Sequence, residues 1–338
     1  MSAPSGRIVQ VTDENNAREN AAVQSYGALL FREDPTGEAA VIMERVCDLS
    51  SADFERFRTA YKTMSDLLIA NMFTYVRQCA LDFLQLTMDA SEAMRDGKVS
   101  PTRPDDVVMW GTKLRSSVLS LCSSVHHHQD QSYIEVKRKF GENSPEHLKM
   151  KSAFADIYDN CFGYRYLYKL RNTMVHFTML ATGMTATSQM HGDEKVAFVD
   201  MYMDRTTLLE QKGHLNQRLR AELQGLTENP SIYTMAGEML PRLLVTNRRV
   251  LEILYPEIDD ICATVVDFDS LFEGRTGIRA TIHQQSPELR PPFTTGYQAW
   301  AGAIFDFAYA RTQSRNGSTP PTSAQTEAPH SNPRAAEV

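Results

Sequence analysis

The sequence predicts a mainly α protein, a bundle of four to six helices with two small β-hairpins added to it. Apolar residues recur at steps of three and four over long stretches, which is the spacing of one helix face. Two apolar runs flank a turn sequence near the start of the chain, and a change to the two-residue period of a strand occurs over residues 185–203. The helical pattern covers far more of the chain, so helices dominate the expected fold.

The composition indicates a globular protein without a general affinity for nucleic acid. The chain has 338 residues, of which 42% are hydrophobic, and a formal net charge of -7. A protein that coats nucleic acid would carry a basic face and a high isoelectric point. A length of 338 residues allows one core or two. We expect a single domain over residues 25–312, between a polar, disordered N-terminus (1–24) and a polar, disordered tail (313–338).

The five cysteines are widely spaced, odd in number and embedded in apolar helical patterns. Such cysteines indicate buried thiols in a reducing compartment rather than a disulfide framework or a zinc site. The N-terminus lacks the apolar core of a signal peptide, and no stretch approaches 18 uninterrupted apolar residues. We therefore expect a cytoplasmic protein with no membrane partner.

The first part of the chain predicts a hairpin and two long helices. Apolar runs flank the turn sequence at residues 34–37, which predicts a hairpin at about 26–46. A helical pattern then begins near residue 51 and continues for more than 30 residues. After a linker that contains two prolines, a second helix runs towards Phe140 and ends at Gly141.

The stretch from Ser144 to Thr178 is the helix around which we expect the chain to be organised. Ser144 is a good N-cap, Pro145 suits the first helical position, and Glu146 suits the positive end of the helix dipole. Its second half has an aliphatic side and a polar side. The aliphatic side carries Leu167, Leu170, Met174 and Phe177, and the polar side carries Arg165, Lys169, Asn172 and His176.

The rest of the chain predicts a second hairpin and further helices. Alternation over residues 185–203 indicates the hairpin, and Asp204 caps the helix that follows. Helical patterns continue over about 232–255, with Pro241 as a point for a kink, and over about 258–272 and 296–312. Residues 274–295 are rich in Pro, Gly and Thr, and we expect them to be irregular.

The polar side of the organising helix carries a motif near its end. Within the segment from Leu170 to His176, Arg171 is followed directly by Asn172, and His176 lies five positions after the arginine. This pattern resembles the signature of the HEPN superfamily, and the resemblance covers the motif and the helices around it. It implies a HEPN-like helical domain and a homodimeric endoribonuclease that uses no metal or cofactor. It also implies an RNA substrate, a role as a toxin or antiviral defence effector, and an antitoxin or regulatory protein as partner.

The residue types in the motif suit this chemistry. Metal-independent cleavage of RNA needs a base for the ribose 2′-hydroxyl and a cation to stabilise the charged phosphorane. The resemblance implies that His176 is the acid or base, Arg171 the phosphate clamp and Asn172 an orienting residue. Arg165 and Lys169 lie on the same helix and give it a local basic character, so we expect them to bind substrate. Positions five apart on a straight helix lie about 140° from each other, so a site assembled across a two-fold axis would bring Arg and His together.

Two alternatives stay open at this stage. The polar side of the helix is also what a solvated face shows, and a HEPN-like domain can be a non-catalytic module that binds RNA, nucleotide or protein. An interaction module predicts that Arg171 and His176 are satisfied by carboxylates of the same chain. In the run from His126 to His128, only His126 has a partner at the four-residue spacing of a helical metal pair, namely Asp130. We expect these three histidines to be exposed side chains near a helix end rather than metal ligands.

Overall fold

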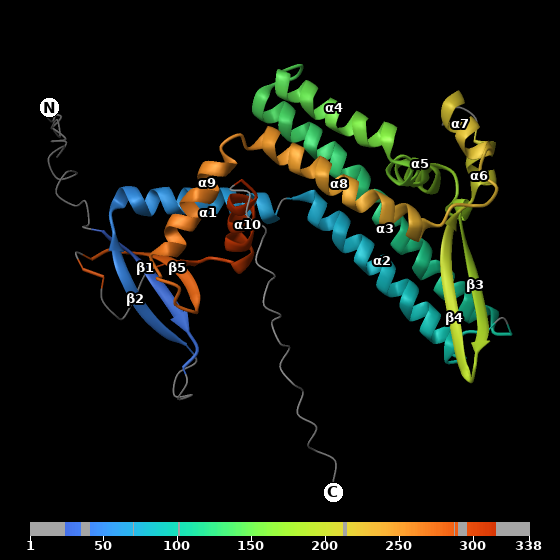
Figure 1. The fold of residues 1–338 in the computed structure, drawn as a ribbon, viewed down its shortest axis with the longest axis horizontal. Coiled ribbons are helices and arrows are strands. Elements are labelled where there is room, and N and C mark those ends of the chain that lie inside the picture. Colours follow the sequence, from blue (N-terminus) through green and yellow to red (C-terminus); the bar gives the residue numbers. More distant parts are fainter. Residues whose placement is uncertain are drawn as a thin grey trace, which may run out of the picture. The chain divides into compact units, whose positions relative to one another are not determined.

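The computed structural model describes residues 24–34, 41–69, 71–100, 102–211, 215–286, 288–289 and 296–315 (Figure 1). The chain divides into two compact units, one formed by residues 67–258 and the other by residues 1–66 together with 259–338. The single domain that we expected over 25–312 spans both of these units. The expected disordered termini lie outside the described residues, apart from Gln24 and residues 313–315, and the last three belong to a helix.

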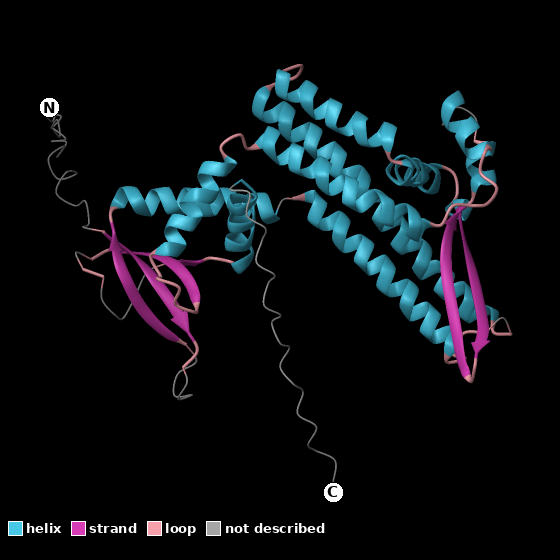
Figure 2. Ribbon diagram, in the orientation of Figure 1, coloured by secondary structure: helices cyan, strands magenta, loops and turns pink. Residues whose placement is uncertain are grey.

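The unit formed by the two ends of the chain contains a four-stranded antiparallel sheet with the order β2-β1-β5-β6. Strands are magenta and helices cyan in Figure 2. Its elements are β1 (Ser25–Arg32), β2 (Ile42–Leu49), α1 (Ser51–Ile69), α9 (Ile258–Ser270), β5 (Ile278–Gln284), β6 (Tyr297–Ala299) and α10 (Gly302–Arg315). The ring of Phe268 stacks on Trp300 with centroids 4.1 Å apart and contacts Phe57 at 5.1 Å. These aromatic contacts join α1 and α9 to the segment between β6 and α10.

The strand β5 contradicts the expectation that residues 274–295 are irregular. Its buried residues Ala280 and Ile282 belong to one apolar cluster with Leu29 and Phe31 of β1. Seven residues of weak alternation give little local signal, so the pairing with β1 is what makes this segment a strand.

The other unit is a helical bundle with a long hairpin packed against it. The long helices are α2 (Met72–Arg95), α3 (Pro104–Phe140), α4 (Pro145–Asn160), α5 (Phe162–His176) and α8 (Ile232–Leu254). The helix α2 packs on α3, and α5 packs on α3 and α8. The hairpin consists of β3 (Thr182–His191) and β4 (Glu194–Met203), with a 3-10 turn (Met179–Ala181) before it, and β4 lies along α2. Two short helices, α6 (Arg205–Glu210) and α7 (Gln217–Gln224), follow the hairpin.

The mainly α class with small β additions is confirmed, but the described residues form ten α-helices instead of four to six. Two long apolar patterns are each divided into two helices. The first divides between α1 and α2, where the Asn71 side chain accepts from the amide of Phe73 and starts a new helix. The second divides at Cys161, which ends α4 and caps α5 by accepting from the amide of Tyr164. The apolar spacing in the sequence continues through both breaks, so it does not reveal where one helix ends and the next begins.

All five cysteines are unpaired, and Cys122, Cys161 and Cys262 are buried. Burial raises the pKa of the Cys262 thiol to about 11, which keeps it protonated and unreactive. Within the described part of the chain, every helix is too short or too polar to span a bilayer.

Candidate functional site

The position of α5 depends on a close approach of its first turn to α8. A Cβ on Gly163 would lie 2.1 Å from the carbonyl oxygen of Met235, so only glycine allows this contact. The amide of Gly163 also donates to Glu238 Oε2 at 3.0 Å. The aliphatic side of α5 then buries Leu167 and Leu170 completely. These contacts fix the helix, and its other side remains accessible.

Arg171 lies on the accessible side and has few partners. Its Nη1 donates to Asn172 Oδ1 at 3.1 Å, while its Nε is buried and has no hydrogen-bond partner. Among the described residues, no carboxylate forms an ion pair with Arg171. The side-chain oxygen of Asn172 is therefore directed to Arg171, whereas the resemblance implied that Asn172 orients the histidine or the phosphate.

His176 is the last residue of α5 and is exposed. Because α5 stays helical through His176, this residue and Arg171 of one chain keep the angle of about 140° that their spacing gives. Lys169 is partly exposed on the same side as His176. Neither Lys169 nor His176 pairs with a carboxylate in the part of the chain that the structure describes.

Arg165, which we expected to bind substrate, is instead buried inside the unit, where its two terminal nitrogens are hydrogen-bonded while its Nε has no partner. It donates to the carbonyl oxygens of Tyr158 and Asp159 at 2.6 and 3.0 Å and to Glu222 Oε1 at 2.6 Å. The two carbonyls belong to the last turn of α4, where carbonyls lack partners within the helix. Arg165 therefore caps α4 and ties α7 to the bundle.

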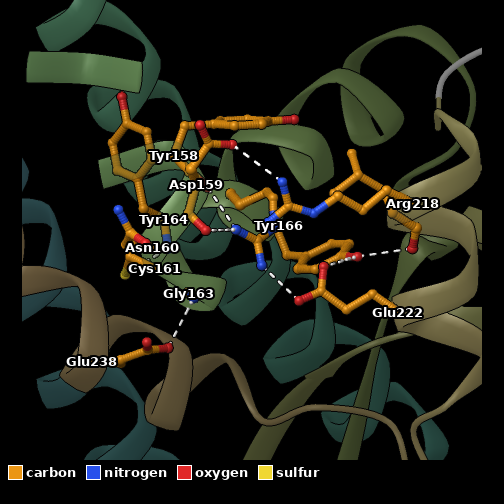
Figure 3. A network of polar contacts seen from close by, with 12 residues as sticks. Tyr158, Asp159, Asn160, Cys161, Gly163, Tyr164, Tyr166, Arg218, Glu222 and Glu238 are labelled. Atoms are coloured by element: carbon orange, nitrogen blue, oxygen red, sulfur yellow. Dashed lines mark hydrogen bonds and ion pairs between the residues drawn. The ribbon is translucent and has the colours of Figure 1, made fainter. Parts of the chain in front are cut away.

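The neighbouring Tyr166 completes this network (Figure 3). Its hydroxyl lies 2.9 Å from both Glu222 Oε2 and the carbonyl oxygen of Leu219. Burial and the nearby Glu222 carboxylate both raise the pKa of the Tyr166 hydroxyl. The network thus joins α4, α5 and α7 on the side of α5 away from Arg171, and its role is structural.

A second group of titratable residues lies against the accessible side of α5. The His126 ring of α3 stacks on Tyr168 of α5, with centroids 4.0 Å apart and an angle of 18° between the planes. The Nδ1 of His126 is 3.0 Å from Asp130 Oδ2. Burial and the Asp130 charge raise the pKa of Tyr168 to about 12, while Arg171 acts in the opposite direction. The hydroxyl of Tyr168 therefore lies within electrostatic reach of both Asp130 and Arg171.

The sequence showed the four-residue spacing of His126 and Asp130 but not the contact with Tyr168. The other two histidines of the run differ from His126 in their surroundings. His127 is exposed, whereas His128 is buried and its Nε2 lies 3.0 Å from Asn247 Oδ1. No group of three or more His, Cys, Asp or Glu side chains within the described segments could hold a metal ion. His126 and Asp130 form a hydrogen-bonded pair, which we call the dyad.

The helical unit also contains an apolar cavity of about 410 Å³ between α2, α3 and the hairpin. Its walls include Met94, Val107, Trp110, Met184 and Val199. The described residues that line it are all apolar, so the cavity offers room for an apolar group but no catalytic side chain.

No family model, curated protein or solved structure matches the chain. The resemblance of the motif to the HEPN signature therefore stays a prediction, and the function of the site is inferred from its own geometry.

Proposed function

We propose that the C-terminal half of α5 is the active site of a metal-independent RNA endonuclease of HEPN type that works as a homodimer. The observation that carries this proposal is the environment of Arg171. This guanidinium is partly buried on an accessible helix face, has no carboxylate partner among the described residues, and shares its helix with the exposed His176.

The two arginines of α5 show why Arg171 suggests an anion site. Arg165 makes three hydrogen bonds, one of them to a carboxylate, and its charge is balanced within the fold. Arg171 uses one of its five donor hydrogens on a neutral amide oxygen. A partly desolvated cation without a counter-charge costs free energy, and a phosphate oxygen would remove that cost. The same argument disfavours an interaction module in which carboxylates of the chain satisfy this residue.

The proposed reaction uses the 2′-hydroxyl of RNA as the nucleophile. His176 accepts the 2′-hydroxyl proton, the 2′-oxygen bonds to phosphorus, and the bond from phosphorus to the 5′-oxygen breaks. Arg171 stabilises the negative charge that develops on the phosphoryl oxygens, and Lys169 adds positive charge for the backbone of the substrate. The products are a 2′,3′-cyclic phosphate and a 5′-hydroxyl, and no metal or cofactor takes part.

A homodimer would overcome the separation of Arg171 and His176 within one chain. A two-fold axis beside α5 would bring Arg171 of one chain towards the histidine of the other. Apolar residues are exposed around this position: Val175 is 46% exposed and Leu180 is 67% exposed. Exposed apolar residues next to a charged site are typical of an interface, so we place the dimer contact at the end of α5.

The biological role comes from the resemblance alone. HEPN enzymes act in toxin–antitoxin and antiviral defence systems, which here would add an antitoxin or regulatory protein as partner. The net charge of -7 disfavours broad affinity for RNA, so we propose a folded substrate with a defined docking surface, such as a transfer RNA.

The alternative function is a non-catalytic module that binds a protein, RNA or nucleotide. The apolar cavity beside the hairpin favours this alternative, because exposed Val108 and Phe198 lie on the elements that form it. A partner that inserts an apolar side chain there would need no catalytic residue on α5.

Cleavage of total RNA and transfer RNA by the purified protein in EDTA tests the proposal. We expect cyclic phosphate ends, and a loss of at least about 100-fold in Arg171→Ala and His176→Ala. Arg218→Ala and His191→Ala are matched controls, because both side chains are exposed and lie outside α5. The controls should cleave at the wild-type rate.

Three outcomes would contradict the proposal. Cleavage that EDTA abolishes would require a metal, and cleavage that persists in both α5 variants would place the active site elsewhere. A folded, dimeric wild-type protein that leaves every RNA intact would favour the interaction module.

A further inference from the structure

Cleavage of RNA through its 2′-hydroxyl requires two proton transfers. One group removes the proton of the 2′-hydroxyl, and another donates a proton to the 5′-oxygen as it leaves. The motif on α5 provides one histidine, His176, for these two tasks. The following inference rests on the proposed function and concerns the second proton carrier.

The dyad of His126 and Asp130 has the chemistry that a proton donor needs. An ionised carboxylate only accepts hydrogen bonds, so the Nδ1 of His126 must donate to Asp130 Oδ2 across the 3.0 Å between them. This bond fixes the orientation of the ring and leaves Nε2 as the atom that exchanges a proton. The His126 side chain is 15% exposed, so the ring is held firmly but is not sealed from solvent.

The stacking contact places the dyad on the Arg171 side of α5. Tyr168, which covers the His126 ring, precedes Arg171 by three residues and Asn172 by four. On a helix these spacings correspond to about 60° and 40°, so the three side chains share one face. His126 therefore belongs to the same surface as the proposed phosphate clamp, although α3 supplies it.

We propose that His126 is the general acid of the site, with Asp130 and Tyr168 as positioning residues. Protonated His126 donates its Nε2 proton to the 5′-oxygen while the bond from phosphorus to that oxygen breaks. His176 receives the 2′-hydroxyl proton, and Arg171 holds the phosphoryl oxygens. The two histidines return to their starting states by exchanging one proton with water, so the reaction is balanced without a further reactant.

A sulfur leaving group tests this role directly. A thiolate leaves without a proton, so an oligonucleotide in which sulfur replaces the bridging 5′-oxygen at the cleavage position no longer needs a general acid. The substrate would be the RNA sequence that the wild-type protein cleaves, with either atom at that position. Single-turnover rates would be measured for the wild type, His126→Gln and Arg171→Ala.

We expect His126→Gln to slow cleavage of the oxygen substrate by about 100-fold or more, and cleavage of the sulfur substrate by less than about tenfold. Arg171→Ala should slow both substrates alike, because the phosphoryl oxygens are the same in both. His127→Gln is the matched control, since His127 is the exposed neighbour of His126 on α3, and it should change neither rate. Asp130→Asn keeps the ring and provides a second variant if His126→Gln fails to fold. It should show a weaker form of the same selective loss.

The results separate the two proposals. Equal losses on both substrates, or no loss on either, would overturn the role of His126 as the acid, while a defect in Arg171→Ala would leave the proposed ribonuclease in place. A wild-type protein that cleaves neither substrate would overturn the proposed function and this inference with it.

Discussion

Removal of the Glu222 charge tests whether Arg165 is structural. The Arg165 side chain is 6% exposed and that of Glu222 is 32% exposed. Breaking a fully buried ion pair costs about 3 to 5 kcal/mol, and the partial exposure of Glu222 lowers this value. We therefore expect Glu222→Gln to reduce the free energy of unfolding by about 2 kcal/mol. For a unit of roughly 190 residues, this corresponds to a fall of about 4 to 8 °C in Tm.

Urea and thermal unfolding followed by circular dichroism would measure this change. Arg218→Ala is the control, because its ion pair with Asp159 is 3.6 Å long and the arginine side chain is 67% exposed, so we expect a change below about 0.5 kcal/mol. A Glu222→Gln protein as stable as the wild type would refute the structural role. The structural role would also be refuted by an Arg165→Met protein that has wild-type stability but fails to bind RNA, because that result would show that Arg165 binds substrate.

Three further predictions concern packing, pH and assembly. Gly163→Ala should destabilise the helical unit by about 3 kcal/mol, because its Cβ would clash with a backbone oxygen of α8. In Gly237→Ala, on α8, the new Cβ has no heavy atom within 4 Å, so this variant should be more stable than the wild type by up to about 1 kcal/mol. Urea unfolding would measure both changes, and equal effects would refute the clash. Burial lowers the pKa of His128 to about 4, so the unfolded chain binds the proton more tightly, and stability should fall by about 3 kcal/mol as the pH drops from about 6.5 to about 4. His128→Gln should make stability depend less on pH over this range, and an unchanged dependence would show that His128 is not its cause. Leu180→Asp should convert the proposed dimer to a monomer in analytical ultracentrifugation and keep the helical circular dichroism of the wild type, since Leu180 is 67% exposed; a monomeric wild type would refute the proposed interface.

Local signals in the sequence predicted much of the fold. The cap at Ser144 and the proline after it start α4 where expected, and the Ser144 hydroxyl accepts from the amide of His147 at 3.1 Å. Apolar runs around a turn sequence predicted the antiparallel pair of β1 with β2, and alternation predicted the pair of β3 with β4. The break at Cys161 escaped prediction because apolar spacing reports which residues are buried, not whether the helix axis continues. The strand β5 escaped it because its pairing partner lies more than 200 residues away.

The candidate site was predicted less evenly. The sequence placed Arg171 and His176 on one helix, and the structure leaves Arg171 partly exposed and His176 exposed on α5. The same helix-face reasoning gave Arg165 the same role, yet Glu222 and the end of α4 bury it. The stacking of His126 on Tyr168 also lay beyond sequence reasoning, because it joins two helices.

By itself, the sequence determined the helical class, the two hairpins and the motif of Arg171, Asn172 and His176, because caps, periodicity and spacing act over a few residues. The tertiary structure decided which of two similar arginines is balanced by a carboxylate and which is not. That difference depends on whether a residue distant in sequence approaches the charge, and burial then sets how much the charge costs. The ion pair with Glu222 of α7 holds Arg165 within the fold, and Arg171 near the end of the same helix has no carboxylate partner among the described residues.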